Sequence, residues 1–460
     1  MGIAERWPDP LPYPPTVKPS ALHIAMISEH ASPLAPAGGV DAGGQNTYVD
    51  QAARALVAAG HRVDVLTRCD DGRLAPTVEV LPGLRVVHLR AGPTRFIPKE
   101  ELLPLMPQFV RSAQRHFGAS PRYDLVHAHF FMSGHVGLAL RQRFHTPLVM
   151  SFHALGLVRR QHQREADRFP AQRIDIERRL VQGADRVVAS CPQDQADLVQ
   201  LYGADPARLA QVPCGVDVHT LHPGGRQEAR QALRLAADEF VVLQVGRMVP
   251  RKGIDNVVRA LALLADEPGL PRARLLIVGG DAAEADEAAT PEIGRLRRLA
   301  GELGIADRVQ FAGRHAAPAL RRFYVAADVF VTTPWYEPFG ITPLEAMACG
   351  TPVVGSAVGG IQHSVLPQVT GHLVPPNDPP ALAARLAELR RDPVRAAAMG
   401  RAGVERVRTL FTWDVVAHGL AGVYRAALRP ATAGTGVIPS AVATACTPAA
   451  ALALPTRLWP

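Results

Sequence analysis

Cysteine is scarce in this 460-residue chain, which contains only Cys69, Cys191, Cys214, Cys349 and Cys446. None of them forms a C-x-x-C pair, and the spacing of cysteine and histidine suggests no zinc site. We therefore expect buried free thiols, no bound metal and a cytoplasmic location, where thiols stay reduced.

Long apolar runs are also missing. No stretch reaches the roughly 20 apolar residues that a transmembrane helix needs. The N-terminus lacks the charged segment followed by an apolar one that marks a signal peptide. Arg6 stands where a myristoylation motif requires serine or threonine. Membrane association is therefore not expected.

Neither sign of charge dominates the chain. It has 50 basic and 42 acidic residues, for a net charge of +8, and only 5% of its residues are aromatic. The basic residues are scattered rather than gathered in a stripe interleaved with aromatic side chains, so we expect no nucleic-acid partner. A solvated basic surface explains the small excess, and an acidic substrate such as a phosphorylated sugar would also fit it.

Short apolar runs alternate with helical patterns along most of the chain, which indicates parallel β-α-β units. A chain of this length favours two domains. We predict an α/β fold of two Rossmann-like domains, with the ligand cleft between them at the carboxyl ends of the strands. The expected strands are Leu22–Ser28, Arg62–Thr67, Arg85–Leu89, Asp124–Ala128, Leu148–Phe152, Arg186–Ser190, Phe240–Val245, Arg274–Val278, Val309–Ala312, Val329–Thr332 and Pro352–Gly355.

Composition suggests the boundaries. Prolines crowd residues 1–20, which we predict to be an extended arm. Residues 21–216 would form an N-terminal Rossmann-like domain and residues 217–412 a C-terminal one. A helix over 413–428 would return to the first domain. Residues 429–460, rich in alanine, threonine and proline, are predicted to be a disordered tail.

The most informative segment is Glu337–Glu345, because two carboxylates flank the start of a helix. A helix start attracts phosphate, and carboxylates accept hydrogen bonds from sugar hydroxyls. The segment therefore predicts a sugar-nucleotide site. Thr342, Pro343 and Glu345 also match a capping box, in which Thr342 is the N-cap and Glu345 binds only a backbone N–H group. A solvated loop carboxylate is the other interpretation of Glu337.

Two cations, Arg247 and Lys252, flank a tight turn after the strand that ends at Val245. Cations at this place can stabilise a diphosphate leaving group, although a solvated loop would look the same. The glycine-rich turn Asp41–Asn46 joins the first strand to the first helix and would let backbone approach a phosphate closely. It lacks the G-x-G-x-x-G pattern, which disfavours NAD.

Together these segments resemble retaining glycosyltransferases of family 4, which have the two-domain GT-B architecture. The resemblance covers residues 21–428 and rests on Asp41–Tyr48, Gly246–Gly253, Gly279-Gly280 and Glu337–Val354. Within the family, the chain is similar to sucrose-phosphate synthases and to the mycothiol-pathway enzyme that adds N-acetylglucosamine to inositol phosphate.

The resemblance implies a role for each matching residue. Arg247 and Lys252 would bind the donor diphosphate, and Glu337 would hold hydroxyls of the donor sugar. The other residues expected at the donor are Gly44 near the phosphate, Gly340, Ile341 and Thr342 at the helix start, Glu345 at the ribose, Arg314 near the base and His153 beside the transferred sugar.

On the acceptor side, Lys99 and Arg173 match a basic pair that holds a phosphorylated acceptor, and Asn46 is the third expected acceptor residue. Taken singly, Lys99 and Arg173 would be interpreted as surface charges. The inositol-phosphate enzyme has tyrosine at the position of Phe130 and threonine at that of Ala154, so two hydroxyl donors are missing here. The sequence leaves phosphorylated and unphosphorylated acceptors open.

We therefore expect a metal-independent enzyme without a cofactor that moves a hexose from an NDP-sugar, with UDP as the expected nucleotide, to a small polar acceptor. Two alternatives remain: a transferase for a glycan or a lipid-linked acceptor of the cell envelope, and a catalytically silent sugar-nucleotide-binding subunit. A homodimer is left open.

Overall fold

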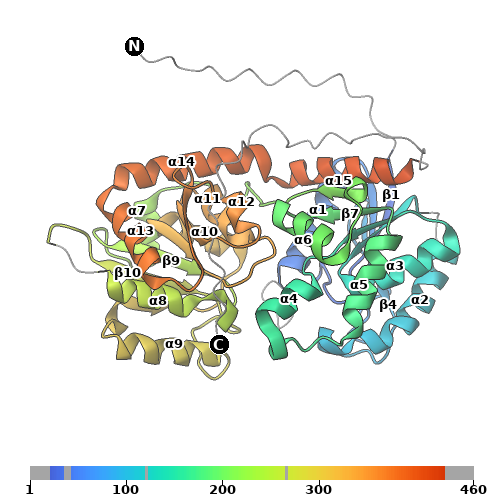
Figure 1. The fold of residues 1–460 in the computed structure, drawn as a ribbon, viewed down its shortest axis with the longest axis horizontal. Coiled ribbons are helices and arrows are strands. Elements are labelled where there is room, and N and C mark those ends of the chain that lie inside the picture. Colours follow the sequence, from blue (N-terminus) through green and yellow to red (C-terminus); the bar gives the residue numbers. More distant parts are fainter. Residues whose placement is uncertain (1–20, 36–42, 120–122, 265–267, 430–460) are drawn as a thin grey trace, which may run out of the picture.

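The computed structural model describes residues 21–35, 43–119, 123–264 and 268–429. The predicted arm, nearly all of the predicted tail and the first part of the glycine-rich turn lie outside these residues. Within them, two α/β lobes lie side by side (Figure 1). No helix of the described part is both long and apolar enough to cross a membrane.

The first lobe is built on an eight-stranded sheet with the order β3-β4-β2-β1-β5-β6-β7-β8. Only β3 runs antiparallel to its neighbour. The strands are β1 (His23–Ile27), β2 (Arg62–Arg68), β3 (Thr77–Leu81), β4 (Leu84–Leu89), β5 (Leu125–His129), β6 (Leu148–Ser151), β7 (Arg186–Ala189) and β8 (Leu209–Gln211).

The second lobe is built on a six-stranded parallel sheet with the order β11-β10-β9-β12-β13-β14. Its strands are β9 (Phe240–Val245), β10 (Ala273–Val278), β11 (Val309–Phe311), β12 (Val329–Thr332), β13 (Val353–Ser356) and β14 (Gly371–Val374). The two parallel sheets confirm the predicted α/β class.

Helices connect the strands and cover both sheets (Figure 1). In the first lobe they are α1 (Gly44–Ala58), α2 (Met106–Ala119), α3 (Phe131–Phe144), α4 (Gly156–Gln163), α5 (Gln172–Gly183) and α6 (Pro192–Tyr202). In the second they are α7 (Arg226–Ala232), α8 (Ile254–Leu263), α9 (Pro291–Glu302), α10 (Ala317–Ala326), α11 (Ile341–Ala348), α12 (Ile361–Ser364), α13 (Pro379–Arg391) and α14 (Pro393–Leu410).

The last helix of the described residues, α15 (Trp413–Leu428), follows the second lobe in sequence but packs on α1, β6 and β7 of the first. The chain therefore passes between the lobes twice, and the two passages run together. The Val216 N–H donates to the Phe411 carbonyl over 2.8 Å, and Val216 pairs with Thr412 in a parallel bridge. A side chain at Gly215 would stand 2.7 Å from the Trp413 ring, so the contact requires glycine.

Four of the five cysteines lie in the described residues. Cys69, Cys191, Cys214 and Cys349 are all buried and free, as predicted.

Candidate active site

An ion pair lies at the carboxyl ends of two neighbouring strands of the second sheet. Lys252 follows β9, Glu337 follows β12, and the Lys252 ammonium contacts the Glu337 carboxylate. Arg251 Nη1 lies 3.7 Å from the same carboxylate. Burial raises the pKa of Glu337, but Lys252, Arg251 and Arg247 together lower it below its usual value. Burial also lowers the pKa of Lys252, more than Glu337 raises it.

Tight backbone contacts hold this pair in place. Gly253 adopts a φ of +62°, and a Cβ atom there would lie 2.0 Å from the Thr333 carbonyl oxygen. The Thr333 hydroxyl donates to the Gly253 carbonyl over 2.9 Å. The Trp335 N–H donates to the Arg251 carbonyl over 3.0 Å. The two loops are therefore joined along their length, and Lys252 is aimed at Glu337.

The loop that carries Glu337 is also packed from its other side. A Cβ atom at Gly359, where φ is +47°, would lie 1.8 Å from the Glu337 carbonyl oxygen. One at Gly360 would lie 2.5 Å from the Phe339 carbonyl oxygen. Glycine at both positions lets the segment after β13 support the loop that precedes α11.

Helix α11 begins two residues earlier than the capping-box interpretation predicts. Its N-cap is Gly340, with φ at +86°, so Thr342 is the second helical residue and not the cap. The left-handed conformation of Gly340 turns the chain into the helix before Thr342 is reached. In the described part of the chain, Glu345 accepts no hydrogen bond from a backbone N–H group; it accepts a hydrogen bond of 2.6 Å from the Tyr324 hydroxyl. Burial raises the pKa of Glu345.

The starts of two helices meet across the lobes. Gly44 is the first residue of α1, and a Cβ atom there would lie 3.6 Å from Ile341 Cδ1, at the first residue of α11. The free N–H groups and positive dipole ends of both helices therefore gather in one place, which suits an anion. Asn46 supports the turn before α1: its side chain accepts from the Gly43 N–H over 3.0 Å and donates to the Ser32 carbonyl over 3.1 Å.

The remaining residues predicted at the donor lie at the same edge of the second sheet. Arg247 follows β9, and its charge shifts the pKa of both Lys252 and Glu337. Arg314 follows β11, and its N–H donates to the Ala282 carbonyl over 2.9 Å.

In the first lobe, the residue predicted to lie beside the transferred sugar is His153. It follows β6 with a φ of +59°, a conformation that non-glycine residues rarely adopt. Its Nε2 lies 2.9 Å from His129 Nδ1, and its ring contacts that of Tyr48 at 5.1 Å. Burial lowers the pKa of His153 to about 3. The imidazole is therefore neutral and can offer a hydrogen bond, not a positive charge.

The interpretation of Arg173 as a surface charge is wrong. The side chain is 1% exposed, and its Nε donates to Glu177 over 2.7 Å. Its guanidinium carbon lies 4.8–5.0 Å from the centres of three rings, which belong to Phe130, Phe131 and Phe169. Lys99 begins the short 3-10 helix Lys99–Glu101 and is half-buried.

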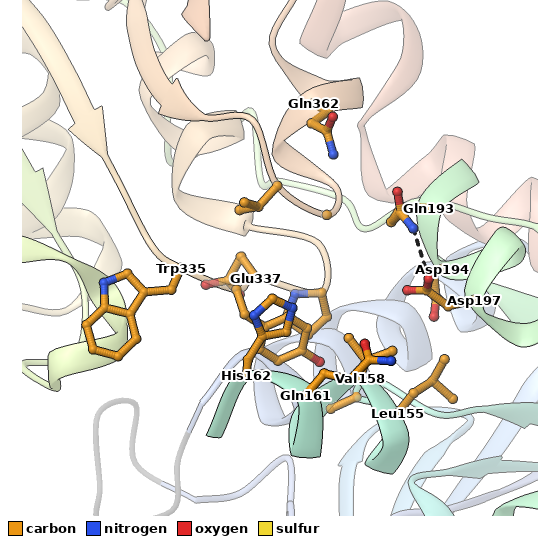
Figure 2. A pocket seen from close by; sticks show the side chains of 15 residues that line it. Leu155, Val158, Gln161, His162, Gln193, Asp194, Asp197, Trp335, Glu337 and Gln362 are labelled. Atoms are coloured by element: carbon orange, nitrogen blue, oxygen red, sulfur yellow. Dashed lines mark hydrogen bonds between the residues drawn. The ribbon is translucent and has the colours of Figure 1, made fainter. Parts of the chain in front are cut away.

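A pocket of about 250 Å³ opens between the lobes and reaches Glu337 (Figure 2). Helices α4 and α6 line it from the first lobe; the loops after β12 and β13 and the start of α12 line it from the second. The sequence did not predict the polar residues of this pocket, because they follow no motif and resemble solvent-facing positions of three helices, α4, α6 and α12. They are Gln161, His162, Gln193, Asp194, Asp197 and Gln362.

Comparison with known proteins agrees with this geometry. A model of Glycosyltransferase Family 4 matches residues 42–220, and one of Glycosyl transferases group 1 matches residues 225–406. A D-inositol 3-phosphate glycosyltransferase from Thermomonospora curvata is 39% identical over 428 residues, which cover 90% of this chain and 98% of the relative. Another from Acidothermus cellulolyticus is 40% identical over 410 residues, covering 88% of this chain and 90% of the relative.

Two solved structures are similar over nearly their whole length. Sucrose-phosphate synthase from Thermosynechococcus elongatus is 39% identical, with a TM-score of 0.79 and coverage of 88% of this chain and 98% of that one. Anabaena HepE, solved with UDP and glucose, is 22% identical with a TM-score of 0.68 and coverage of 88% and 99%; it supports the fold alone. The two-lobed fold and these similarities show that the chain belongs to family 4 of the glycosyltransferases, with the GT-B architecture.

Proposed function

We propose that the protein is a retaining hexosyltransferase that uses an NDP-sugar, with UDP as the nucleotide, and a small polar acceptor. The observation that carries the proposal is the meeting of the two helix starts at Gly44 and Ile341 beside the Lys252–Glu337 pair. The helix starts and Lys252 suit a diphosphate, and the Glu337 carboxylate suits sugar hydroxyls. Relatives named for inositol 3-phosphate and for sucrose phosphate support the same class of reaction.

The cations and the helix would bind the diphosphate. An ammonium group has three donors, so the contact of Lys252 with Glu337 leaves two for phosphate oxygens. Arg247 and the first N–H groups of α11 would share the charge that develops on the departing phosphate. Glu337 would hold hydroxyls of the transferred sugar, and His153 would face that sugar from the first lobe.

The outer part of the donor would lie along the second lobe. Glu345 would bind the ribose. Because the Tyr324 hydroxyl already donates to this carboxylate, the ribose would share it with Tyr324. Arg314 would lie near the base.

The proposed reaction is a front-side displacement. The bond between the anomeric carbon and the phosphate oxygen breaks as the acceptor oxygen forms its bond on the same face. Because the new bond forms on the face that the phosphate leaves, the configuration is retained. The acceptor's proton passes to the departing phosphate. Positive charge at the leaving group comes from Lys252, Arg247 and the helix, and the proposal includes no metal ion.

The test is turnover of UDP-glucose against a panel of polar acceptors, measured as UDP release and product mass. Lys252→Ala should lower kcat/KM by ~10²–10³, the usual effect of losing one such electrostatic contact. Arg251 remains near Glu337 in this variant, so the fold should persist. Arg272→Ala removes an exposed cation paired with Asp307 and serves as the matched control.

Wild-type turnover by Lys252→Ala would remove the leaving-group role. If UDP raises the Tm but no acceptor ever yields UDP, the protein is a silent sugar-nucleotide-binding subunit. If only a glycan or a lipid-linked sugar is used, the envelope alternative is correct.

A further inference from the structure

The pocket between the lobes borders the place where the proposed function puts the transferred sugar, and the inference drawn from it rests on that function. Glu337, which would hold the transferred sugar, forms part of its wall (Figure 2). Ala154, the neighbour of His153, also lines it. A molecule in this pocket would therefore stand beside the anomeric carbon. The volume of about 250 Å³ suits a small ligand.

Carboxylates dominate the charge of this pocket. Its lining includes Asp194, Asp197 and Glu337, and it includes no lysine or arginine among the described residues. Glu337 is compensated by Lys252, but the described contacts of the other two are hydrogen bonds from neutral groups. Asp194 accepts from the N–H and hydroxyl of Ser190 over 2.8 and 3.1 Å. Asp197 accepts from the Gln193 amide over 2.9 Å.

Asp194 and Asp197 lie three residues apart on α6 and so share one face of the helix. Burial raises the pKa of Asp194 to about 6 and raises that of Asp197 in the same direction. A phosphate in the pocket would face these two charges, and juxtaposed like charges are strongly unfavourable.

Arg173 does not offset the negative charge. Its guanidinium is paired with Glu177, which is itself fully buried and also accepts from the Gly156 N–H over 2.9 Å. A second guanidinium nitrogen donates to the Ala154 carbonyl. The third, Nη1, is buried and has no hydrogen-bond partner among the described residues. A phosphate could reach Nη1 only by displacing the side chains that bury it.

The neutral part of the lining suits hydroxyl groups. Gln161, Gln193 and Gln362 carry amides that both donate and accept hydrogen bonds. The rings of His162 and Tyr336 stack at 5.1 Å and 11°, one from each lobe, and present apolar surface. Amides and stacked rings together can bind the polar edges and apolar faces of a sugar.

We propose that the acceptor is an uncharged polyhydroxylated molecule, a sugar or sugar alcohol, and that this pocket discriminates against its phosphorylated counterpart. In this proposal the acceptor lies in the pocket beside Glu337 and not against a basic pair formed by Lys99 and Arg173.

The test compares matched acceptors with one donor, UDP-glucose. The pairs are myo-inositol with inositol 3-phosphate, fructose with fructose 6-phosphate, and glucose with glucose 6-phosphate. For the pair that is used best, kcat/KM should favour the unphosphorylated member by about tenfold or more, because the phosphate meets two carboxylates. Asp197→Asn keeps the size and the contact with Gln193 but removes one charge, so the phosphorylated member should gain relative to its partner.

Asp175→Asn is the matched control, since Asp175 is exposed on α5 away from the pocket lining, and it should not change the ratio. Equal use of both members, or preference for the phosphorylated one, would overturn the inference and leave the proposed function intact. An unchanged ratio in Asp197→Asn would also overturn it. Absence of any transfer while UDP still raises the Tm would overturn the proposed function, and the inference with it.

Discussion

At the scale of single residues, glycines, which lack a Cβ atom, decide how closely the loops of the site approach one another. Gly253, Gly359 and Gly360 each bring a backbone within contact of a neighbouring carbonyl, and these contacts fix the positions of Lys252 and Glu337. The charged residues bind substrate in our proposal, but the glycines set the distance between them.

Gly253→Ala should therefore be unusually costly. Alanine at a φ near +62° is strained by ~1–2 kcal/mol, and the clash of its Cβ with the Thr333 carbonyl should add ~1–3 kcal/mol. Gly203→Ala isolates the first effect, because Gly203 has a φ of +66° and no atom within 4 Å of the added carbon. Urea unfolding of both variants gives the difference, and equal losses would show that the close approach costs nothing.

Asp194 should make stability depend on pH. Its pKa in the folded state, about 6, lies above the ordinary value of 3.8, so folding favours the protonated carboxyl. The resulting contribution to the free energy of unfolding is complete at a pH below the ordinary pKa and is lost as the pH rises through about 6.

Wild type should thus lose unfolding free energy relative to Asp194→Asn between about pH 4 and about pH 7, since asparagine cannot ionise. Urea unfolding at several pH values measures this. The exposed Asp175→Asn variant should follow wild type throughout, and a parallel pH course for Asp194→Asn would contradict the assignment.

At the scale of elements, the start of α11 shows how the local sequence pattern and the fold diverge. The spacing of Thr342, Pro343 and Glu345 satisfies a capping box, but the left-handed Gly340 starts the helix earlier. Pro343 then occupies the third helical position, where its missing N–H is still not needed. The early start makes the N–H groups of Ile341 and Thr342 part of the first turn, where they have no partner within the helix, and the Ile341 side chain lies next to the first residue of α1.

Gly340→Ala should weaken the donor site. Alanine would be strained at a φ of +86°, and its Cβ would lie 3.0 Å from Ile361 Cγ1. Tilting of the first turn should raise the Kd for UDP by about tenfold, within the ~2 kcal/mol that a helix terminus contributes. Calorimetric titration with UDP measures this. Gly350→Ala, at a φ of +81° beyond the other end of α11, strains the same helix away from the site and should leave the Kd near wild type.

Much of the fold could be predicted, because buried parallel strands are continuous apolar runs. All eleven expected strands are present within a residue or so at each end. The strands that were not predicted are all edge strands: β3 is half-exposed and antiparallel, β8 has three residues, and β14 contains a glycine and a histidine. The pocket was missed for another reason, since its residues come from four separated segments that only the packing of two lobes brings together.

At the scale of the whole molecule, α15 links the passages between the lobes to the site. Trp413, its first residue, covers Gly215 and contacts the ring of Tyr48 at 5.7 Å. Tyr48 in turn contacts His153. A structural change where the chain crosses between the lobes can therefore shift His153, the residue that would face the transferred sugar.

Trp413→Ala should lower the unfolding free energy by ~3–5 kcal/mol, as for other large buried side chains, and should also lower kcat at temperatures where the protein stays folded. Trp413→Phe keeps a ring against Tyr48 and should retain more of both. Urea unfolding and UDP release measure the two effects. Full kcat in a destabilised Trp413→Ala variant would show that the contact chain serves stability alone.

The double passage at Val216 and Phe411 makes the second lobe an insertion within the first. No single cut of the polypeptide can separate the lobes into intact halves, because the N-terminal fragment would lack α15, the helix that covers α1. During synthesis, the first lobe must wait for its final helix until the whole second lobe has left the ribosome. A helix that is synthesised after the second lobe thus completes the lobe that is synthesised before it.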